Sequence, residues 1–279
     1  MRGRGLHTAR PVVVHVQPAD AGAGIVFRRR VRGGRIIRVP ALWERRVSQP
    51  LCTALQDAEG LLIRTVEHLL AALSALRIDN ATVDLDAEEL PIFNGSATPW
   101  CEAIRDAGRV ELPALCTMIR VLRSVEVRDG RRTLRIEPAE RFSIAARLAL
   151  AHFAEMSWEG DVTPESFTRD LAPSRSFGRL KWALPARLYA TLTRRPVLRG
   201  ANFSTTAAII GGRVIGGMTV PDEPVRHRAL DLVGDLSLAG HPILGHVTAA
   251  HTGHDLNHAL VARLMRDPSA WDLVTGPAG

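Results

Sequence analysis

The chain has 279 residues, 46% hydrophobic and 23% charged, which is typical of a globular protein with a substantial core and excludes a disordered one. It lacks the run of about eighteen apolar residues of a membrane-spanning helix and the apolar stretch of a secretory signal, so we expect a cytoplasmic protein. The net charge of +7 favours phosphate-bearing partners. Aromatic residues make up only 5% and no nucleic-acid-binding motif accompanies the arginines, so we do not expect nucleic acid to be a partner.

The first part of the chain predicts short strands and two helices. β-Branched or alternating runs predict strands at residues 12–16, 25–27 and 81–86. The arginine-rich stretch 28–49 has weak periodicity and predicts a hairpin insertion or a long loop. Apolar residues recur at spacings of three and four from Arg64 to Leu76, which predicts a helix with one apolar face. A second helix is predicted at residues 100–107.

A new series of strands begins after Pro113. Strands are predicted at residues 118–122, 125–127, 133–136 and 144–150, and helices at 226–239 and about 255–266. Strands followed by helices, seen twice, predict an α+β fold of two similar domains, each a sheet layered with helices, with the active site between them. We place the domains at residues 1–114, with the arginine-rich insertion at about 28–49, and 115–279.

Two predicted helices carry residues with the spacing of a metal site. His227, Asp231 and Asp235 are four residues apart, so they lie along one helix face, where the first two could hold one ion. His68, near the start of the helix at 64–76, would be the third ligand. Imidazole and carboxylate ligands suit zinc, and a catalytic zinc keeps a position open for water.

Acid–base residues accompany these candidate ligands. Glu67 precedes His68 and would lie near the metal without binding it, which is the position of a general base. Asp235 could orient His254, and His254 could protonate a leaving amine. A structural interpretation of each residue stays open, because an isolated His on a helix is usually a surface or core residue and a His-x-x-x-Asp pair is often only a side-chain contact.

Short motifs follow one another in a characteristic order over nearly the whole chain. They are Gly5-Leu-His-Thr8, Leu51-Cys-Thr53, Thr65-Val-Glu-His-Leu-Leu-Ala-Ala72, Ile78-Asp-Asn80, Pro91-Ile-Phe-Asn-Gly-Ser96, Ser174-Arg-Ser-Phe-Gly178, Val225-Arg-His-Arg-Ala-Leu-Asp231, Gly234-Asp-Leu236, Gly240-His241 and Gly253-His254. In these motifs the chain resembles the UDP-3-O-acyl-N-acetylglucosamine deacetylase family, zinc hydrolases of lipid A biosynthesis. The resemblance implies the two-domain layered fold predicted above.

The resemblance also implies a reaction. Its substrate would be an acylated UDP-aminosugar, UDP-3-O-(3-hydroxyacyl)-N-acetylglucosamine, from which the enzyme removes the N-acetyl group. The metal, zinc or alternatively iron(II), would be held by His68, His227 and Asp231. Glu67 would take a proton from the zinc-bound water as it attacks the amide.

Further residues receive roles from the same resemblance. His254 would be the catalytic histidine, held in its charged form by Asp235. Ser176 stands where the family has a threonine that helps to stabilise the oxyanion, and Phe177 matches an aromatic residue that lines the sugar site. Arg228 replaces a lysine that contacts the substrate, so the charge is kept but its geometry changes.

Two segments bear on the substrate. Residues 178–202 match the family's acyl-chain passage, where Trp182, Leu184, Leu188, Tyr189 and Leu192 could form an apolar stripe near an anionic membrane surface. A helix packed on the core is the alternative. The stretch 200–207 departs from the family pattern, which leaves open a divergent paralogue acting on another acylated or nucleotide-linked aminosugar, or a non-catalytic relative that binds a lipid or sugar nucleotide. A monomer is favoured.

Overall fold

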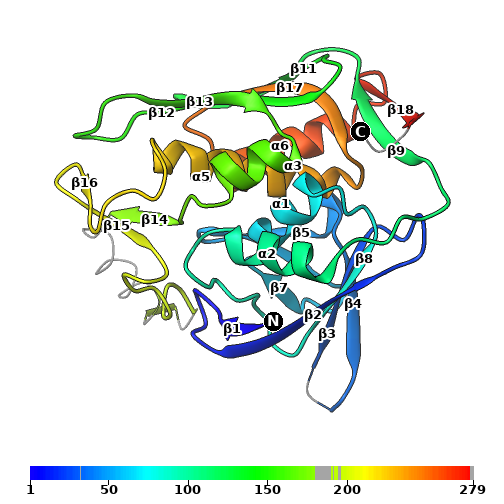
Figure 1. Ribbon diagram of the computed structural model, residues 1–279, viewed down its shortest axis with the longest axis horizontal. Coiled ribbons are helices and arrows are strands. Elements are labelled where there is room, and N and C mark those ends of the chain that lie inside the picture. The colour runs from blue at the N-terminus through cyan, green and yellow to red at the C-terminus, as the bar shows by residue number, and fades with distance from the viewer. Residues whose placement is uncertain (32, 180–189, 191, 194–195, 277–279) are drawn as a thin grey trace.

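The computed structural model describes residues 1–31, 33–179, 190, 192–193 and 196–276. These residues form four layers, in which two sheets enclose two layers of helices (Figure 1). The helices of the inner layers are α1 (Glu67–Ala75), α2 (Thr98–Ala107), α5 (Glu223–Leu236) and α6 (His254–Met265). The four predicted helices are therefore confirmed, with ends shifted by at most three residues. The arrangement confirms an α+β fold of two similar domains.

The sheet of the first domain has five strands in the order β1-β2-β8-β3-β4. Its strands are β1 (Arg2–Arg4), β2 (Pro11–Pro18), β3 (Ile25–Arg30), β4 (Ile36–Pro40) and β8 (Ala81–Leu85). Strands β3 and β8 run parallel, whereas the other neighbours are antiparallel. Alternate residues such as Val12, Val14 and Val83 are buried in the core, as expected for a sheet with one covered face.

The arginine-rich stretch contributes strands rather than a long loop. Its first part forms the β3–β4 hairpin within the five-stranded sheet, where Arg28 forms an ion pair with Asp84 of β8. Its last part forms the 3-10 helix η1 (Trp43–Arg45) and β5 (Arg46–Gln49). β5 joins β6 (Cys52–Gln56) and β7 (Leu62–Arg64) in a small antiparallel sheet.

The second large sheet has seven strands, five of them in the order β10-β11-β17-β12-β13. Strand β9 adds to β17, and β18 adds to β9. The strands are β9 (Cys116–Val121), β10 (Val125–Asp129), β11 (Arg132–Glu137), β12 (Phe142–Leu148), β13 (Met156–Asp161), β17 (Ile243–Ala250) and β18 (Trp271–Gly276). The short helices α3 (Pro164–Ser166), η2 (Phe167–Leu171) and η4 (Ser237–Ala239) complete this part.

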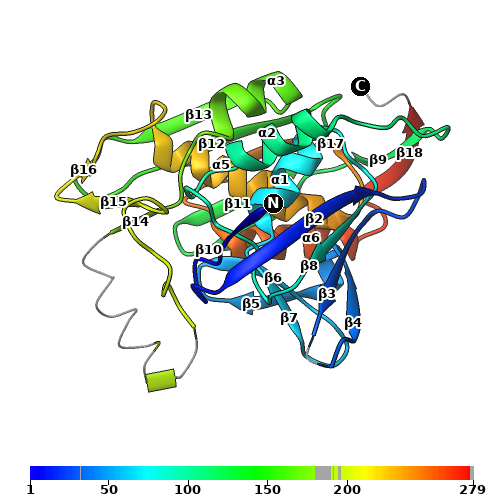
Figure 2. The ribbon, with the colours of Figure 1, turned by 60° about the horizontal axis from the view of Figure 1, so that its bottom comes forward.

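The two domains share one connectivity. Each large sheet contains four strands in chain order and a fifth strand, β8 or β17, inserted between the second and third and parallel to the third. A helix precedes the inserted strand and another follows it. A three-stranded sheet precedes the first of these helices in each domain, β5–β7 before α1 and β14 (Phe177–Arg179), β15 (Ala207–Ile210) and β16 (Arg213–Val214) before α5. Figure 2 shows these small sheets on different sides of the molecule. The boundary between residues 114 and 115 stays a prediction.

Helices α1 and α5 pack very closely. A Cβ atom at Gly234 of α5 would lie 2.1 Å from the carbonyl oxygen of Glu67, so only glycine allows the two backbones this approach. Thr65, just before α1, has a left-handed backbone with φ 58°. This turn and the close contact together place the start of α1 beside the C-terminal half of α5.

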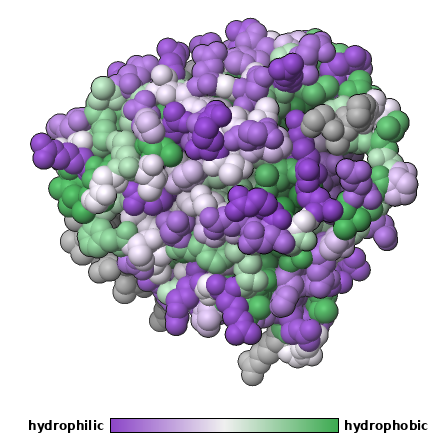
Figure 3. Space-filling model, in the orientation of Figure 1, coloured by the Kyte–Doolittle hydropathy of each residue, from purple (hydrophilic) through white to green (hydrophobic). Residues whose placement is uncertain are grey.

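The proposed acyl passage is described in part. Trp182, Leu184, Leu188 and Tyr189 lie outside the described residues, and Leu192 is 75% exposed. Ile210 of the neighbouring small sheet and Ile215, which follows its last strand, are exposed, and Figure 3 shows an apolar surface over this sheet. In the described part of the chain, every helix is too short or too polar to cross a membrane.

Candidate metal centre

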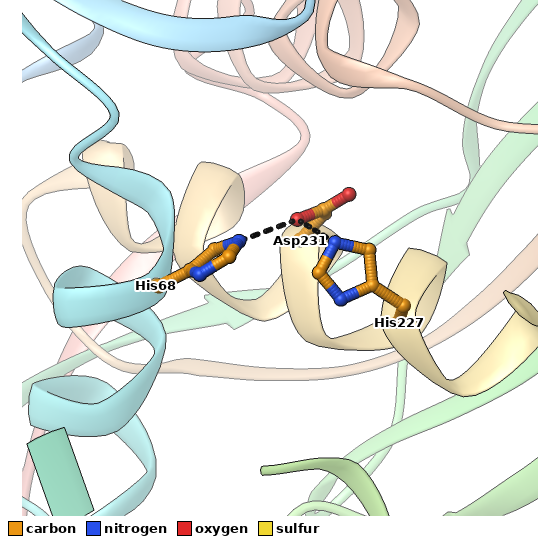
Figure 4. Close-up of side chains that lie close together, drawn as sticks. All are labelled: His68, His227 and Asp231. Carbon is orange, nitrogen blue, oxygen red and sulfur yellow. Dashed lines mark ion pairs between the residues drawn. The ribbon is translucent and has the colours of Figure 1, made fainter. Parts of the chain in front are cut away.

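Three buried side chains meet where α1 contacts α5. His68 comes from α1, and His227 and Asp231 come from successive turns of α5 (Figure 4). One ligand atom from each lies within 4.8 Å of the other two. The Nε2 atoms of His68 and His227 lie 3.7 and 3.5 Å from Oδ1 of Asp231. The sequence-predicted ligand set is thus brought together by the fold.

The chemistry of these donors fits a metal ion. Oδ1 of Asp231 is buried without a hydrogen-bond partner among the described residues, a costly state that a cation would relieve. Nδ1 of His227 lies 3.1 Å from the carbonyl oxygen of Ser174 and donates a hydrogen bond to it. The proton is therefore on Nδ1, and the lone pair of Nε2 is available to bind a metal. Burial lowers the pKa of His68 and of His227 to about 3, which keeps both imidazoles neutral, as metal binding requires.

Glu67 lies beside this donor set. Its side chain is buried, and Oε2 accepts a hydrogen bond of 3.0 Å from the backbone N–H of Thr53. Burial raises the pKa of Glu67 to about 8; the charge of His254 opposes the shift, and Asp231 and Asp235 reinforce it. This pKa favours the protonated carboxyl group at neutral pH. A cation held by the adjacent donor set would lower the pKa and favour the carboxylate, the form that accepts a proton.

His254 begins α6 and faces the same centre. Its Nδ1 lies 2.9 Å from Oδ2 of Asp235, and its Nε2 lies 4.0 Å from Oδ2 of Asp231. Burial alone would lower the pKa of His254, but the charges of Asp235 and Asp231 and the hydrogen bond raise it to about 10. The pKa of Asp235 is lowered, because His254, Thr53 and Asn257 overcome the effect of burial. His254 is therefore an imidazolium at neutral pH, the form that can donate a proton.

The residues assigned to the substrate lie at the edge of the centre. The Phe177 ring packs edge-on against the His227 ring, with centroids 6.1 Å apart. The Arg228 guanidinium lies 5.2 Å from the Phe177 centroid and 3.8 Å from Asp231. Half-buried Ser176 precedes Phe177 and is fixed by backbone hydrogen bonds to Gly95 and Ala207. These bonds fix the backbone of Ser176 directly before β14 and Phe177.

Three residues that hold the candidate site residues in place were not predicted from the sequence. Thr53 contacts Glu67, Asp235 and His254, Asn257 donates to Asp235, and the carbonyl of Ser174 orients His227. Thr53 and Ser174 lie in motifs that the sequence singles out, but their partners are far along the chain. Local spacing therefore gives no sign of these contacts.

Comparisons with known proteins match almost the whole chain. The family model described as LpxC, UDP-3-O-acyl N-acetylglycosamine deacetylase, matches residues 1–266. A UDP-3-O-acyl-N-acetylglucosamine deacetylase of Myxococcus xanthus (strain DK1622) is 37% identical over 98% of this chain and 86% of its own length. Proteins of the same name from Shewanella sp. (strain ANA-3) and Shewanella baltica (strain OS155 / ATCC BAA-1091) are each 34% identical over 98% of this chain and 89% of their own length.

Proposed function

Because the chain belongs to the UDP-3-O-acyl N-acetylglycosamine deacetylase family, we propose that it hydrolyses the acetamide of UDP-3-O-(3-hydroxyacyl)-N-acetylglucosamine in lipid A biosynthesis. The observation that carries the proposal is the convergence of a buried His–His–Asp donor set with a carboxyl group and an imidazolium. Such a centre has each group that metal-assisted amide hydrolysis needs. A protein that only binds a sugar nucleotide has no need of a carboxyl group and an imidazolium beside a metal-binding donor set.

We assign the metal to His68, His227 and Asp231. Two imidazoles and one carboxylate suit zinc, and iron(II) suits the same donors. When bound, such an ion supplies Lewis acidity, which polarises a carbonyl oxygen and makes a water molecule more acidic.

The chain's own residues move the protons in this proposal. Oε2 of Glu67 already accepts the amide of Thr53, so Oε1 takes the proton from the water molecule that attacks the acetamide carbon. His254 gives its Nε2 proton to the departing sugar nitrogen as the C–N bond breaks. The products are acetate and a free glucosamine derivative. The Ser176 hydroxyl is assigned to the oxyanion, and Phe177 and Arg228 to the sugar nucleotide.

The proposed setting is cytoplasmic, with peripheral contact to an anionic membrane. The acylated substrate gives a reason for such contact. Exposed Ile210 of β15 pairs with exposed Arg213 of β16, and exposed Ile215 follows β16; this combination of apolar and basic groups suits a lipid surface. Sedimentation with anionic vesicles should deplete the protein from solution, whereas neutral vesicles should leave it there.

Acetate release from UDP-3-O-(3-hydroxyacyl)-N-acetylglucosamine by zinc-loaded protein tests the activity. We expect turnover that Glu67→Gln lowers by about 100-fold or more, because the variant keeps the shape of the side chain but loses the base. Glu44→Gln is the matched control, since Glu44 is exposed. Unchanged turnover in Glu67→Gln would contradict the assigned base.

The substrate is tested separately from the chemistry. If folded, zinc-loaded wild-type protein leaves this substrate intact, the lipid A assignment is wrong. Release of acetate from another acylated or nucleotide-linked aminosugar would then identify a divergent paralogue, for which residues 200–207 are the first segment to exchange.

A further inference from the structure

Thr53 contacts both acid–base residues at once. It lies in β6 with 1% of its surface exposed. Its backbone N–H donates to Oε2 of Glu67 at 3.0 Å, and its hydroxyl donates to Oδ1 of Asp235 at 2.5 Å. The same hydroxyl oxygen lies 3.2 Å from Nδ1 of His254. Thr53 and Asp235 are 182 residues apart, so one side chain joins the two domains.

The directions of these hydrogen bonds follow from the number of protons available. The hydroxyl has one proton, and Oδ1 of Asp235 takes it. Oδ2 of Asp235 accepts from Nδ1 of His254 at 2.9 Å and from Nδ2 of Asn257 at 2.8 Å. Both carboxylate oxygens are therefore held from different directions, and removing the Thr53 hydroxyl frees one of them. The carboxylate, and the imidazole bonded to it, would then be free to turn.

The backbone of Thr53 is tied equally firmly to the base. The N–H of Val66 donates to the carbonyl oxygen of Thr53 at 3.3 Å, one residue before Glu67. Strand β6 is itself held between β5 and β7. The main chain of Thr53 is thus fixed to the start of α1, whereas its side chain reaches α5 and α6. A shift of Thr53 would therefore affect both Glu67 and the Asp235–His254 pair.

We propose that Thr53 is a positioning residue. It fixes the position of the proton-donating imidazole of His254 relative to the proton-accepting carboxyl group of Glu67 across the domain interface. The inference rests on the roles proposed above for Glu67 and His254. Thr53 itself exchanges no proton with the substrate. Its hydroxyl acts through Asp235 on the imidazole, and its amide acts directly on the carboxyl group of Glu67.

Two substitutions separate this role from general stability. Thr53→Val has nearly the same shape and keeps the backbone N–H but lacks the hydroxyl, whereas Thr53→Ser keeps the hydroxyl. We expect Thr53→Val to lower kcat by about tenfold or more with KM changed less than about twofold, because a lost hydrogen bond to a charged group misdirects the acid without touching substrate binding. Thr53→Ser should retain most of kcat. Thr168→Val is the matched control, since its hydroxyl bonds only to the carbonyl of Pro164 among the described residues.

A second readout is independent of turnover. In metal-free protein, the NMR signal of the His254 Nδ1 proton reports the bond to Asp235. We expect its chemical shift to change in Thr53→Val and to match the wild type in Thr53→Ser and Thr168→Val. Zinc affinity should stay within about twofold in all three, because the ligands are not altered. Thr53→Ala, measured in parallel, replaces the valine variant if valine prevents folding.

The outcomes are distinct. A wild-type kcat and an unchanged His254 signal in the hydroxyl-free variants would overturn the proposal. So would equal loss of kcat in Thr53→Ser and Thr53→Val, or a loss that appears in KM. If wild-type protein shows no deacetylation, the proposed function is wrong, but the NMR comparison still decides whether Thr53 holds Asp235 and His254 in place.

Discussion

At the scale of single residues, Glu223, one helical turn before His227, shows how a buried carboxylate outside the donor set stabilises the fold. It accepts hydrogen bonds from Arg175 and from the hydroxyl of Thr219. Burial alone would raise its pKa, but these bonds lower the pKa below its ordinary value. A lowered folded-state pKa means that the stabilisation is present above the unfolded-state value of about 4.3 and is lost as the pH falls through the folded-state pKa.

Glu223→Gln should therefore destabilise the protein in a pH-dependent way. We expect a loss of about 1 to 3 kcal/mol in the free energy of unfolding at pH 7, because neutral amide replaces a charged acceptor. The difference should shrink as the pH falls below the unfolded-state value of about 4.3 and through the lowered folded-state pKa, where the wild-type carboxylate is itself protonated. Urea unfolding at pH 7 and at a pH below that unfolded-state value measures the difference. An equal loss at both would show that shape, not charge, is responsible.

At the scale of elements, the contact between α1 and α5 decides whether the centre forms. Glu67 and His68 begin one helix, and His227 and Asp231 lie on the other. Gly234 lets the backbones meet, since any Cβ there would strike a carbonyl oxygen that cannot move aside.

Gly234→Ala should separate these helices. We expect a loss of about 1 to 3 kcal/mol in stability from overpacking, and a fall in kcat of about 100-fold, because a shift near 1 Å misplaces the base and a ligand. Thermal unfolding and acetate release are the measurements. Gly178→Ala is the stability control, where the new Cβ would meet its nearest neighbour at 3.8 Å. Wild-type behaviour of both variants would show that α1 and α5 can relax without cost.

Elements also show what the sequence could predict. The apolar periodicity of residues 64–76 predicts helix α1, and the spacing of four residues predicts that His227 and Asp231 lie on one face of α5. Strands such as β7, β14 and β16 have two or three residues, too few for a period to appear. Thr53 and Ser174 act on residues that only the folded chain brings near, so no local pattern could reveal them. The family resemblance supplied Ser176 and Phe177, whose local sequence carries no chemical signature of its own.

At the scale of the whole molecule, the proposed ligands His68, His227 and Asp231 come from both domains. A bound ion should therefore stabilise the folded two-domain structure, by about 4 kcal/mol when the free ion is at roughly 1,000 times its dissociation constant. We expect chelation to lower the melting temperature by several degrees and zinc to restore it. Asp231→Asn should weaken both effects, because it replaces the proposed ligand whose Oδ1 has no hydrogen-bond partner within the described part of the chain. Calorimetry with and without chelator decides this, and identical melting curves would exclude a structural contribution of the ion.

The matching connectivity of the two large sheets has a historical meaning. Duplication and fusion of one shorter gene would produce two units with the same strand order and the same helix placement. In the ancestral pair, two identical helices would have met across a twofold axis, each presenting the same side chains. In the fused chain, α1 carries Glu67 and His68 whereas α5 carries His227 and Asp231. Fusion of two such units would allow the two helices to diverge independently, so that a symmetric contact could become a centre with the proposed base on one helix and two of the proposed ligands on the other.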